Sequence, residues 1–202
     1  SVNKEFSFAE VIGDEGVVFC YDRYVGGQFF DASSGTTVSP LLRGYRLEVF
    51  YYPKNNIYIV ASRRSSIINF WKKGLPEFEA ITLEGTFNGI AVNKAETLLA
   101  IATDGGRVKF LDLVNKEPVG NVLRHDADVR GMVFHPVNDR FVFTYSNDAE
   151  LFGWDRVAQN VFMGPVKVLR GWNLYIDDKG KSLTTRSFSG KFFRIPIQIP
   201  EE

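Results

Sequence analysis

Few side chains in this chain could carry out nucleophilic, acid–base or metal chemistry. The sequence contains one cysteine, Cys20, and two histidines, His125 and His135. One cysteine and two histidines cannot by themselves complete a four-ligand zinc site. Neither histidine is followed by a motif that supplies a nucleophile, and no motif marks a pair of carboxylates for glycoside hydrolysis. We therefore predict a protein that is not an enzyme and that has no catalytic residue, metal or cofactor.

Two short polar motifs that could suggest ligand binding are better interpreted as turns. Residues 104–106 (Asp-Gly-Gly) are typical of a tight turn, and no helix pattern or Lys-Ser/Thr pair follows as in a phosphate-binding loop. Residues 177–180 (Asp-Asp-Lys-Gly) read as a turn between strands. Cys20 lies among apolar strand residues, so we predict a buried small hydrophobic side chain and not a nucleophile.

The sequence that follows His125 alternates short apolar segments with polar turns. Residues 129–134, 141–144 and 150–154 are rich in β-branched and aromatic residues, which favour strands. Asp148 lies in an Asn-Asp pair whose short polar side chains suit a tight turn. The pattern predicts three consecutive β-strands.

The same stretch carries a longer motif. From His125 to Pro136 the spacing is H-x3-V-x2-V-x-F-x-P (with Met132 at the second apolar position), and a polar turn and a closing Trp-Asp pair follow. This combination resembles a repeat of the WD-repeat β-propeller family, most strongly over residues 85–155. In that family a histidine, a hydroxyl, an aspartate and a tryptophan form a hydrogen-bonded chain that braces each repeat. The resemblance implies such structural roles for His125, Thr144 or Ser146, Asp148 and Trp154.

A similar strand ending recurs at intervals of about 40–45 residues, which is the period of a four-stranded propeller blade. The equivalent positions are Phe30, Trp71, Leu111, Trp154 and Ile195. We predict an all-β propeller of about five WD-like repeats that forms a single domain over residues 1–202, with a last repeat that lacks its outer strand. The repeats cover roughly residues 6–42, 45–83, 87–123, 128–168 and 172–197.

The last predicted repeat leaves a sheet edge without a fourth strand, and such an edge exposes backbone donors and acceptors. Sequence upstream of Ser1 could complete a larger ring, a partner chain could supply a strand, or five repeats could close imperfectly. We favour a chain that does not stand alone as a closed monomer. A second copy, a different subunit or a missing N-terminal segment would then cover apolar side chains near the gap, among them Phe6, Phe8, Phe192, Phe193 and Ile195.

The composition limits the classes of partner. Among 202 residues, Lys+Arg and Asp+Glu both number 24, and this zero net charge does not favour nucleic acid or an anionic membrane. No apolar run approaches the roughly 20 residues that span a bilayer, and the first residues lack a signal-peptide pattern. Together with the lone cysteine, these features favour a cytoplasmic or otherwise intracellular location without membrane association, and a processed secreted chain is the alternative.

Charge is nevertheless unevenly distributed along the chain. Residues 41–75 contain seven bases and one acid, Glu48, whereas residues 76–128 contain nine acids and five bases. Two interpretations stay open: the charges lie on solvated loops of separate repeats, or they form a polarised face that docks a partner with an acidic surface.

The resemblance implies a non-enzymatic scaffold for protein partners, because WD-like propellers are mostly rigid binding platforms. The loops before each first strand, and those between second and third strands, are expected on one face. Arginine, tyrosine and tryptophan dominate binding hot spots. A carbohydrate-binding five-bladed propeller is the alternative, and a propeller enzyme is less favoured. The candidate partner-binding residues are Arg23, Tyr24, Arg43, Tyr45, Arg63, Arg64, Phe87, Asn88, Arg130, Trp172 and Asn173.

Overall fold

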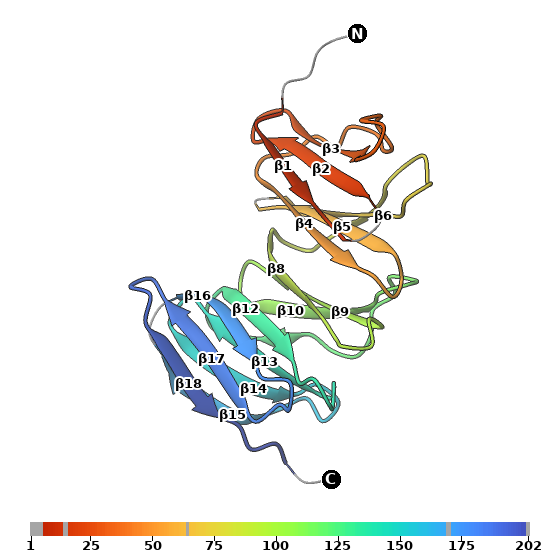
Figure 1. The fold of residues 1–202 in the computed structure, drawn as a ribbon. Helices are drawn as coiled ribbons and strands as arrows, with labels where there is room; N and C mark the ends of the chain where they lie inside the picture. Colours follow the sequence, from red (N-terminus) through yellow and green to blue (C-terminus); the bar gives the residue numbers. More distant parts are fainter. Residues whose placement is uncertain (1–5, 14–15, 64, 169–170, 201–202) are drawn as a thin grey trace. The chain divides into compact units, whose positions relative to one another are not determined.

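The computed structural model describes residues 6–13, 16–63, 65–168 and 171–200 (Figure 1). This part of the chain forms eighteen β-strands in five antiparallel sheets, which confirms the predicted all-β class. None of the described residues belongs to a helix long and apolar enough to cross a bilayer. The chain divides into two compact units, residues 1–87 and 88–202, and each is described separately.

The first sheet of the N-terminal unit has the order β1–β2–β3. Its strands are β1 (Phe8–Val11), β2 (Val17–Asp22) and β3 (Gly26–Asp31). The first repeat was predicted to begin at about residue 6, and its first strand begins at Phe8, which pairs with Tyr21. Residues 36–42, where a four-stranded repeat over residues 6–42 would have its outer strand, form no continuous strand, because they pair with β3 only at two isolated bridges, Phe30 to Thr37 and Gly27 to Leu42.

Side-chain hydrogen bonds explain the interruption of this outer segment. The backbone N–H of Phe29 donates to Ser39 Oγ at 3.0 Å, where a regular ladder would use a carbonyl. Gln28 Nε2 donates to the Ser39 carbonyl at 2.8 Å. Pro40 has no N–H to offer to a ladder. The segment therefore follows β3 without becoming a regular strand.

The second sheet of the N-terminal unit has four strands in sequence order. They are β4 (Leu47–Tyr52), β5 (Ile57–Ser62), β6 (Ile67–Trp71) and β7 (Glu79–Thr82). Every residue of β5 is buried, as expected of an apolar strand between two neighbours. The two sheets share one apolar core, in which the Phe29 ring stacks on Trp71 with centroids 4.5 Å apart and Tyr58 packs beside both.

The C-terminal unit contains three sheets. The first has the order β11–β10–β9–β8, the second β12–β13–β14–β15 and the third β16–β17–β18. The strands are β8 (Phe87–Val92, beginning at the unit boundary), β9 (Leu98–Thr103), β10 (Arg107–Asp112), β11 (Leu123–Arg124), β12 (Val129–Phe134), β13 (Phe141–Ser146), β14 (Glu150–Asp155), β15 (Asn160–Lys167), β16 (Gly171–Ile176), β17 (Ser182–Ser187) and β18 (Phe192–Pro196).

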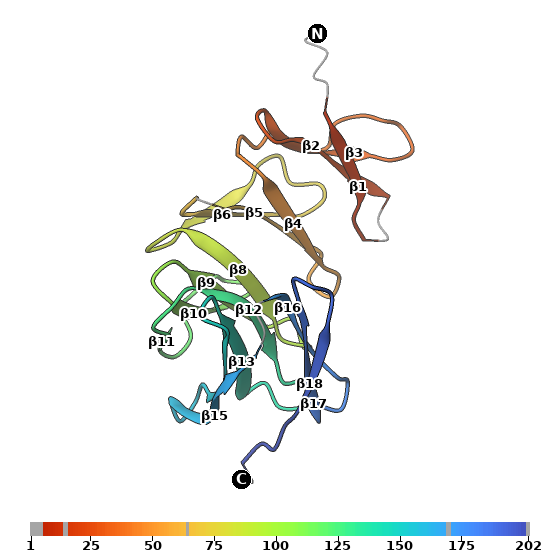
Figure 2. The ribbon, with the colours of Figure 1, turned by 90° about the vertical axis from the view of Figure 1, so that its left-hand side faces the viewer.

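These three sheets pack against one another in sequence order. One apolar cluster joins the first and second sheets, with the Phe110 and Phe134 rings in edge contact at 6.1 Å. Another joins the second and third sheets through Phe143, Leu174 and Leu183. Both views place β16 beside β12 (Figures 1 and 2). Each of these sheets thus buries apolar side chains against its neighbour.

The predicted turns are present, and Cys20 is less buried than expected. Gly105 and Gly106 adopt positive φ angles of 69° and 70° in the β9–β10 turn. Asp177 Oδ1 accepts the N–H of Lys179 at 3.0 Å, which closes the β16–β17 turn. Cys20 is half-buried in β2, and this burial raises the pKa of its thiol, so the thiolate is disfavoured.

Candidate partner-binding site

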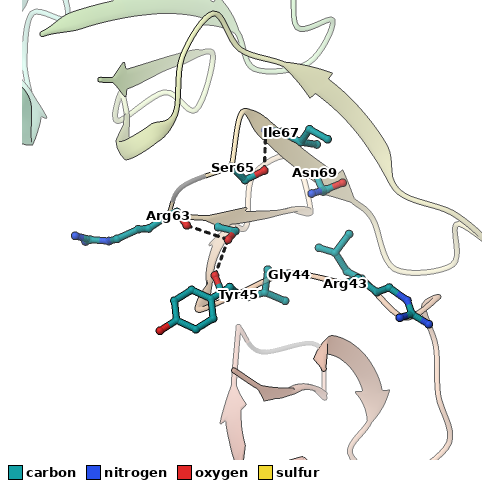
Figure 3. A pocket seen from close by; sticks show the side chains of 10 residues that line it. Arg43, Gly44, Tyr45, Arg63, Ser65, Ile67 and Asn69 are labelled. Atoms are coloured by element: carbon teal, nitrogen blue, oxygen red, sulfur yellow. Dashed lines mark hydrogen bonds between the residues drawn. The ribbon is translucent and has the colours of Figure 1, made fainter. Parts of the chain in front are cut away.

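A pocket of about 540 Å³ opens at one end of the sheets in the N-terminal unit (Figure 3). It contains three residues of the predicted binding face, Arg43, Tyr45 and Arg63. The described lining combines arginine, tyrosine, serine and asparagine side chains with aliphatic residues, so it offers hydrogen-bonding groups and apolar contacts. The lining residues are Leu42, Arg43, Gly44, Tyr45, Leu47, Ser62, Arg63, Ser65, Ile67 and Asn69.

Antiparallel pairing brings the pocket walls together. Leu47 at the start of β4 pairs with Ser62 at the end of β5, so the loop before β4 and the β5–β6 turn share one end of the sheet. Ser62 Oγ donates to the Tyr45 carbonyl at 2.5 Å and fastens the loop to the turn. In the turn, the N–H of Ile67 donates to Ser65 Oγ at 3.0 Å. The backbone around the pocket is therefore held by local hydrogen bonds.

The two arginines flank the pocket on opposite sides. Figure 3 shows the Arg43 and Arg63 side chains extending away from each other. Arg63 Nε donates to Glu48 Oε1 at 2.5 Å, with side chains 42% and 33% exposed. An ion pair this exposed contributes only about 0–1 kcal/mol to stability. Its main effect is to orient the Arg63 guanidinium, whose terminal nitrogens make no hydrogen bond to the described residues.

A second loop extends the site beyond the pocket. The Tyr24 ring lies 6.3 Å from the Tyr45 ring, and the Arg46 guanidinium lies 5.3 Å above the same Tyr45 ring. Tyr24 is 80% exposed. Gly26 (φ 120°) lets the β2–β3 turn lie close to the backbone before β4, because a Cβ at this position would lie 2.1 Å from the Leu42 carbonyl oxygen. Arg23 precedes Tyr24 in the same turn and is also exposed.

The structure brings some of the predicted partner-binding residues together and leaves others apart. Arg23, Tyr24, Arg43, Tyr45 and Arg63 are carried by three loops at one end of the N-terminal unit. The sequence did not indicate the serines, the asparagine and the aliphatic residues of the pocket. The one sequence feature that could have indicated any of them is the two-residue period of β6, which places Ile67 and Asn69 on the same face of the strand.

The remaining candidates do not join this group. Phe87 is 1% exposed, so its ring cannot contact a partner. Asn88 is partly buried, and Arg130 is paired with Asp128 at 3.5 Å in the C-terminal unit. Arg64 lies outside the described residues, as do the side chains of Trp172 and Asn173.

The basic stretch over residues 41–75 divides between the two ends of the β4–β7 sheet. Arg43 and Arg46 precede β4 and Arg63 follows β5, so these cations share the pocket end. The lysines at position 54 and at 72–73 follow β4 and β6 and thus belong to the opposite end. The cations at the pocket end are all arginines, which bind carboxylates more specifically than lysines do.

In the C-terminal unit, Thr144 joins two residues of the predicted structural brace. His125 Nε2 lies 2.6 Å from Thr144 Oγ1, and Trp154 Nε1 donates to the same oxygen at 2.7 Å. Ser146 Oγ donates instead to Asp148 Oδ1. Burial is the main reason that the pKa of His125 falls to about 4, so the ring is neutral near pH 7.

His135 also has a local structural environment. Its Nδ1 accepts the N–H of Asn138 at 3.1 Å, and its ring packs against Gly180. Within the described residues, histidine, cysteine and carboxylate side chains form no group of three that could hold a metal ion. The search of protein-family models found none that matches this chain.

Proposed function

We propose that this chain is a WD-like β-propeller segment that acts as a non-enzymatic scaffold and holds a protein partner on the loops of its N-terminal unit. The observation that carries the proposal is the convergence of Arg23, Tyr24, Arg43, Tyr45 and Arg63 around one pocket. Arginine and tyrosine are enriched at binding hot spots because they combine large contact area with directed hydrogen bonds.

Two further features support the scaffold proposal. Five antiparallel sheets of three or four strands follow one another along the chain, and neighbouring sheets within each unit share apolar cores. This is the sheet size and order expected of propeller repeats. The loops at the pocket end are also fixed by hydrogen bonds to the sheets, as a pre-organised binding surface requires. The intracellular setting expected from the sequence belongs to the same proposal.

The proposal is tested by comparing the two ends of one sheet. The tagged chain and two variants would be expressed in cells, and their partners quantified by affinity purification and mass spectrometry. The site variant carries Tyr24→Ala and Arg43→Glu, and the matched control carries Lys72→Glu and Lys73→Glu at the opposite end. All four positions are exposed, so both variants are expected to fold.

We expect a defined set of protein partners to be lost from the site variant and retained by the control. Retention of every partner by the site variant would contradict the proposal. So would binding of glycans on an array without any protein partner, which would favour the carbohydrate-binding alternative.

A further inference from the structure

We infer that the pocket binds an extended acidic peptide segment of the partner, with one apolar side chain inside the pocket and carboxylates on both sides of it. This inference rests on the proposed function and specifies the chemistry of the partner. Leu42, Leu47 and Ile67 supply the apolar contacts, and Arg43 and Arg63 supply the cations.

The pocket interior favours an apolar side chain. Three aliphatic residues line it, and Ile67 remains 43% exposed although it lies at the start of a β-strand. The hydroxyls of Ser62 and Ser65 already take part in local hydrogen bonds. Burying aliphatic surface stabilises a complex by roughly 25 cal/mol per Å². A leucine-sized side chain would therefore gain affinity here without leaving these hydroxyls unpaired.

The local charge favours carboxylates at the pocket edge. Among the described residues, the three loops carry Arg23, Arg43, Arg46 and Arg63, whereas the acids at this end are Asp22, Glu48 and Glu84, which follows β7 beside the β5–β6 turn. Two of these acids are already engaged, because Asp22 accepts the Ser7 hydroxyl at 2.5 Å and Glu48 accepts Arg63 Nε. The four arginines also outnumber the three acids. Arg43 makes no ion pair with any described residue. The excess positive charge at this end is therefore left for a ligand.

The placement of the two arginines favours a peptide over a small molecule. Their guanidinium groups extend outward on opposite sides of the pocket (Figure 3), so the negative charges that they bind lie outside the cavity. A ligand enclosed by the cavity could not reach both. An extended chain presents side chains at regular intervals and could place acids on both sides of an apolar residue.

The inference is tested with a defined peptide and the purified full chain. The probe is fluorescein-labelled Gly-Ser-Asp-Glu-Leu-Glu-Asp-Ser-Gly, and fluorescence polarisation measures its affinity. One comparison peptide replaces every acid by its amide, another replaces leucine by glycine, and a single-stranded RNA oligonucleotide tests for general anion binding. Arg43→Glu and Ile67→Ser alter the cationic edge and the apolar wall separately, and Lys72→Glu is the matched control. Thermal unfolding verifies that each variant is folded.

We expect the acidic peptide to bind the wild-type chain with an affinity that falls as salt concentration rises. Arg43→Glu should weaken binding by about tenfold or more, because it places like charges together. Ile67→Ser should remove the preference for leucine over glycine, and Lys72→Glu should have no effect. Equal binding of the amide peptide, tighter binding of RNA, or no binding of the acidic peptide would overturn the inference.

The outcome is distinguishable from that of the proposed function. If the peptide fails to bind but Tyr24→Ala with Arg43→Glu still removes cellular partners, the scaffold proposal stands and only the peptide chemistry is wrong. If the peptide binds but those substitutions leave every cellular partner in place, the pocket chemistry stands and the scaffold proposal fails.

Discussion

Thr144 stabilises the C-terminal unit through its hydroxyl oxygen, which contacts two buried side chains. Trp154 Nε1 donates to this oxygen, and His125 Nε2 lies 2.6 Å from it. Thr144 itself is 0% exposed and lies in the fully buried strand β13. Removing the hydroxyl would leave polar nitrogens of both rings without a partner and shielded from water. A buried polar group without a partner costs about 1–3 kcal/mol.

Thr144→Val is therefore expected to lower the free energy of unfolding by about 2–4 kcal/mol. Valine has nearly the same shape as threonine, so the loss would reflect hydrogen bonding and not a cavity. Urea unfolding followed by tryptophan fluorescence measures it. Thr184→Val is the matched control, because the Thr184 hydroxyl on β17 makes no hydrogen bond to the described residues; its effect should stay within about 0.5 kcal/mol. Equal losses for the two variants would contradict this account.

The pKa of His125 predicts how stability depends on pH. Burial lowers this pKa to about 4 in the folded chain, although the charges of Asp148, Asp126 and Glu150 act in the opposite direction. An unfolded chain has a histidine pKa near 6.5. Below about pH 6.5 the unfolded chain therefore binds a proton that the folded chain excludes. Neutral His125 therefore makes its full contribution to the free energy of unfolding above about pH 6.5, and this contribution is lost as the pH falls toward 4.

We expect this loss to reach about 3 kcal/mol, since each unit of pKa difference corresponds to about 1.4 kcal/mol. Urea unfolding at a series of pH values between 6.5 and 4.5 measures the slope of the free energy of unfolding against pH. His125→Gln should flatten the slope, whatever it does to stability at neutral pH. His135→Gln is the comparison, because burial lowers the pKa of His135 as well. A slope that His125→Gln leaves unchanged would assign the pH dependence to other groups.

At the scale of single elements, the β9–β10 turn offers a matched pair of glycines. Gly105 and Gly106 have nearly identical positive φ angles, so an added side chain strains both backbones alike. A Cβ on Gly105 would meet no atom within 4 Å, whereas a Cβ on Gly106 would lie 2.3 Å from the His125 carbonyl oxygen. The carbonyl of Gly106 also accepts the N–H of His125 at 2.9 Å. The close approach at Gly106 thus positions the start of the brace.

Gly105→Ala is expected to cost about 1–2 kcal/mol from backbone strain alone. Gly106→Ala should cost clearly more, because the backbone at His125 must also move away. Thermal or urea unfolding of the two variants gives the difference directly. Comparable losses would mean that the approach of the two backbones contributes little to stability.

The sequence predicted the elements best where apolar period and turn chemistry agree. β12, β13 and β14 begin where expected, at residues 129, 141 and 150, because β-branched and aromatic runs alternate there with polar turns such as the Asn-Asp turn before β14. Residues 36–42 of the first predicted repeat form no regular fourth strand, because the Ser39 side chain takes the place of a ladder bond, which no periodicity reveals. Of the residues that line the pocket, the sequence singled out only Arg43, Tyr45 and Arg63, as candidate partner-binding residues. The pocket's serines and aliphatic residues meet through antiparallel register, which depends on pairing between segments far apart in sequence.

At the scale of the whole molecule, large apolar side chains are exposed on the first and last sheets. On β1, Phe8 is 48% and Val11 is 73% exposed; on β18, Phe192 is 67% exposed. Ile195 and Phe193, which were expected near the same gap, are half-buried, and Ile195 packs at the edge of the C-terminal core. Contiguous exposed apolar area is normally covered by a partner or by another part of the assembly.

We therefore expect the purified chain to self-associate or to bind an apolar dye, because water-exposed Phe8 and Phe192 favour any contact that buries them. Size-exclusion chromatography with light scattering measures the mass, and dye fluorescence measures the exposed surface. Phe8→Ser combined with Phe192→Ser should reduce both signals. Val137→Ser is the control, since Val137 is 74% exposed in the β12–β13 loop and belongs to neither strand, so both signals should stay unchanged. A wild-type chain that is strictly monomeric and does not bind the dye would show that these faces need no cover.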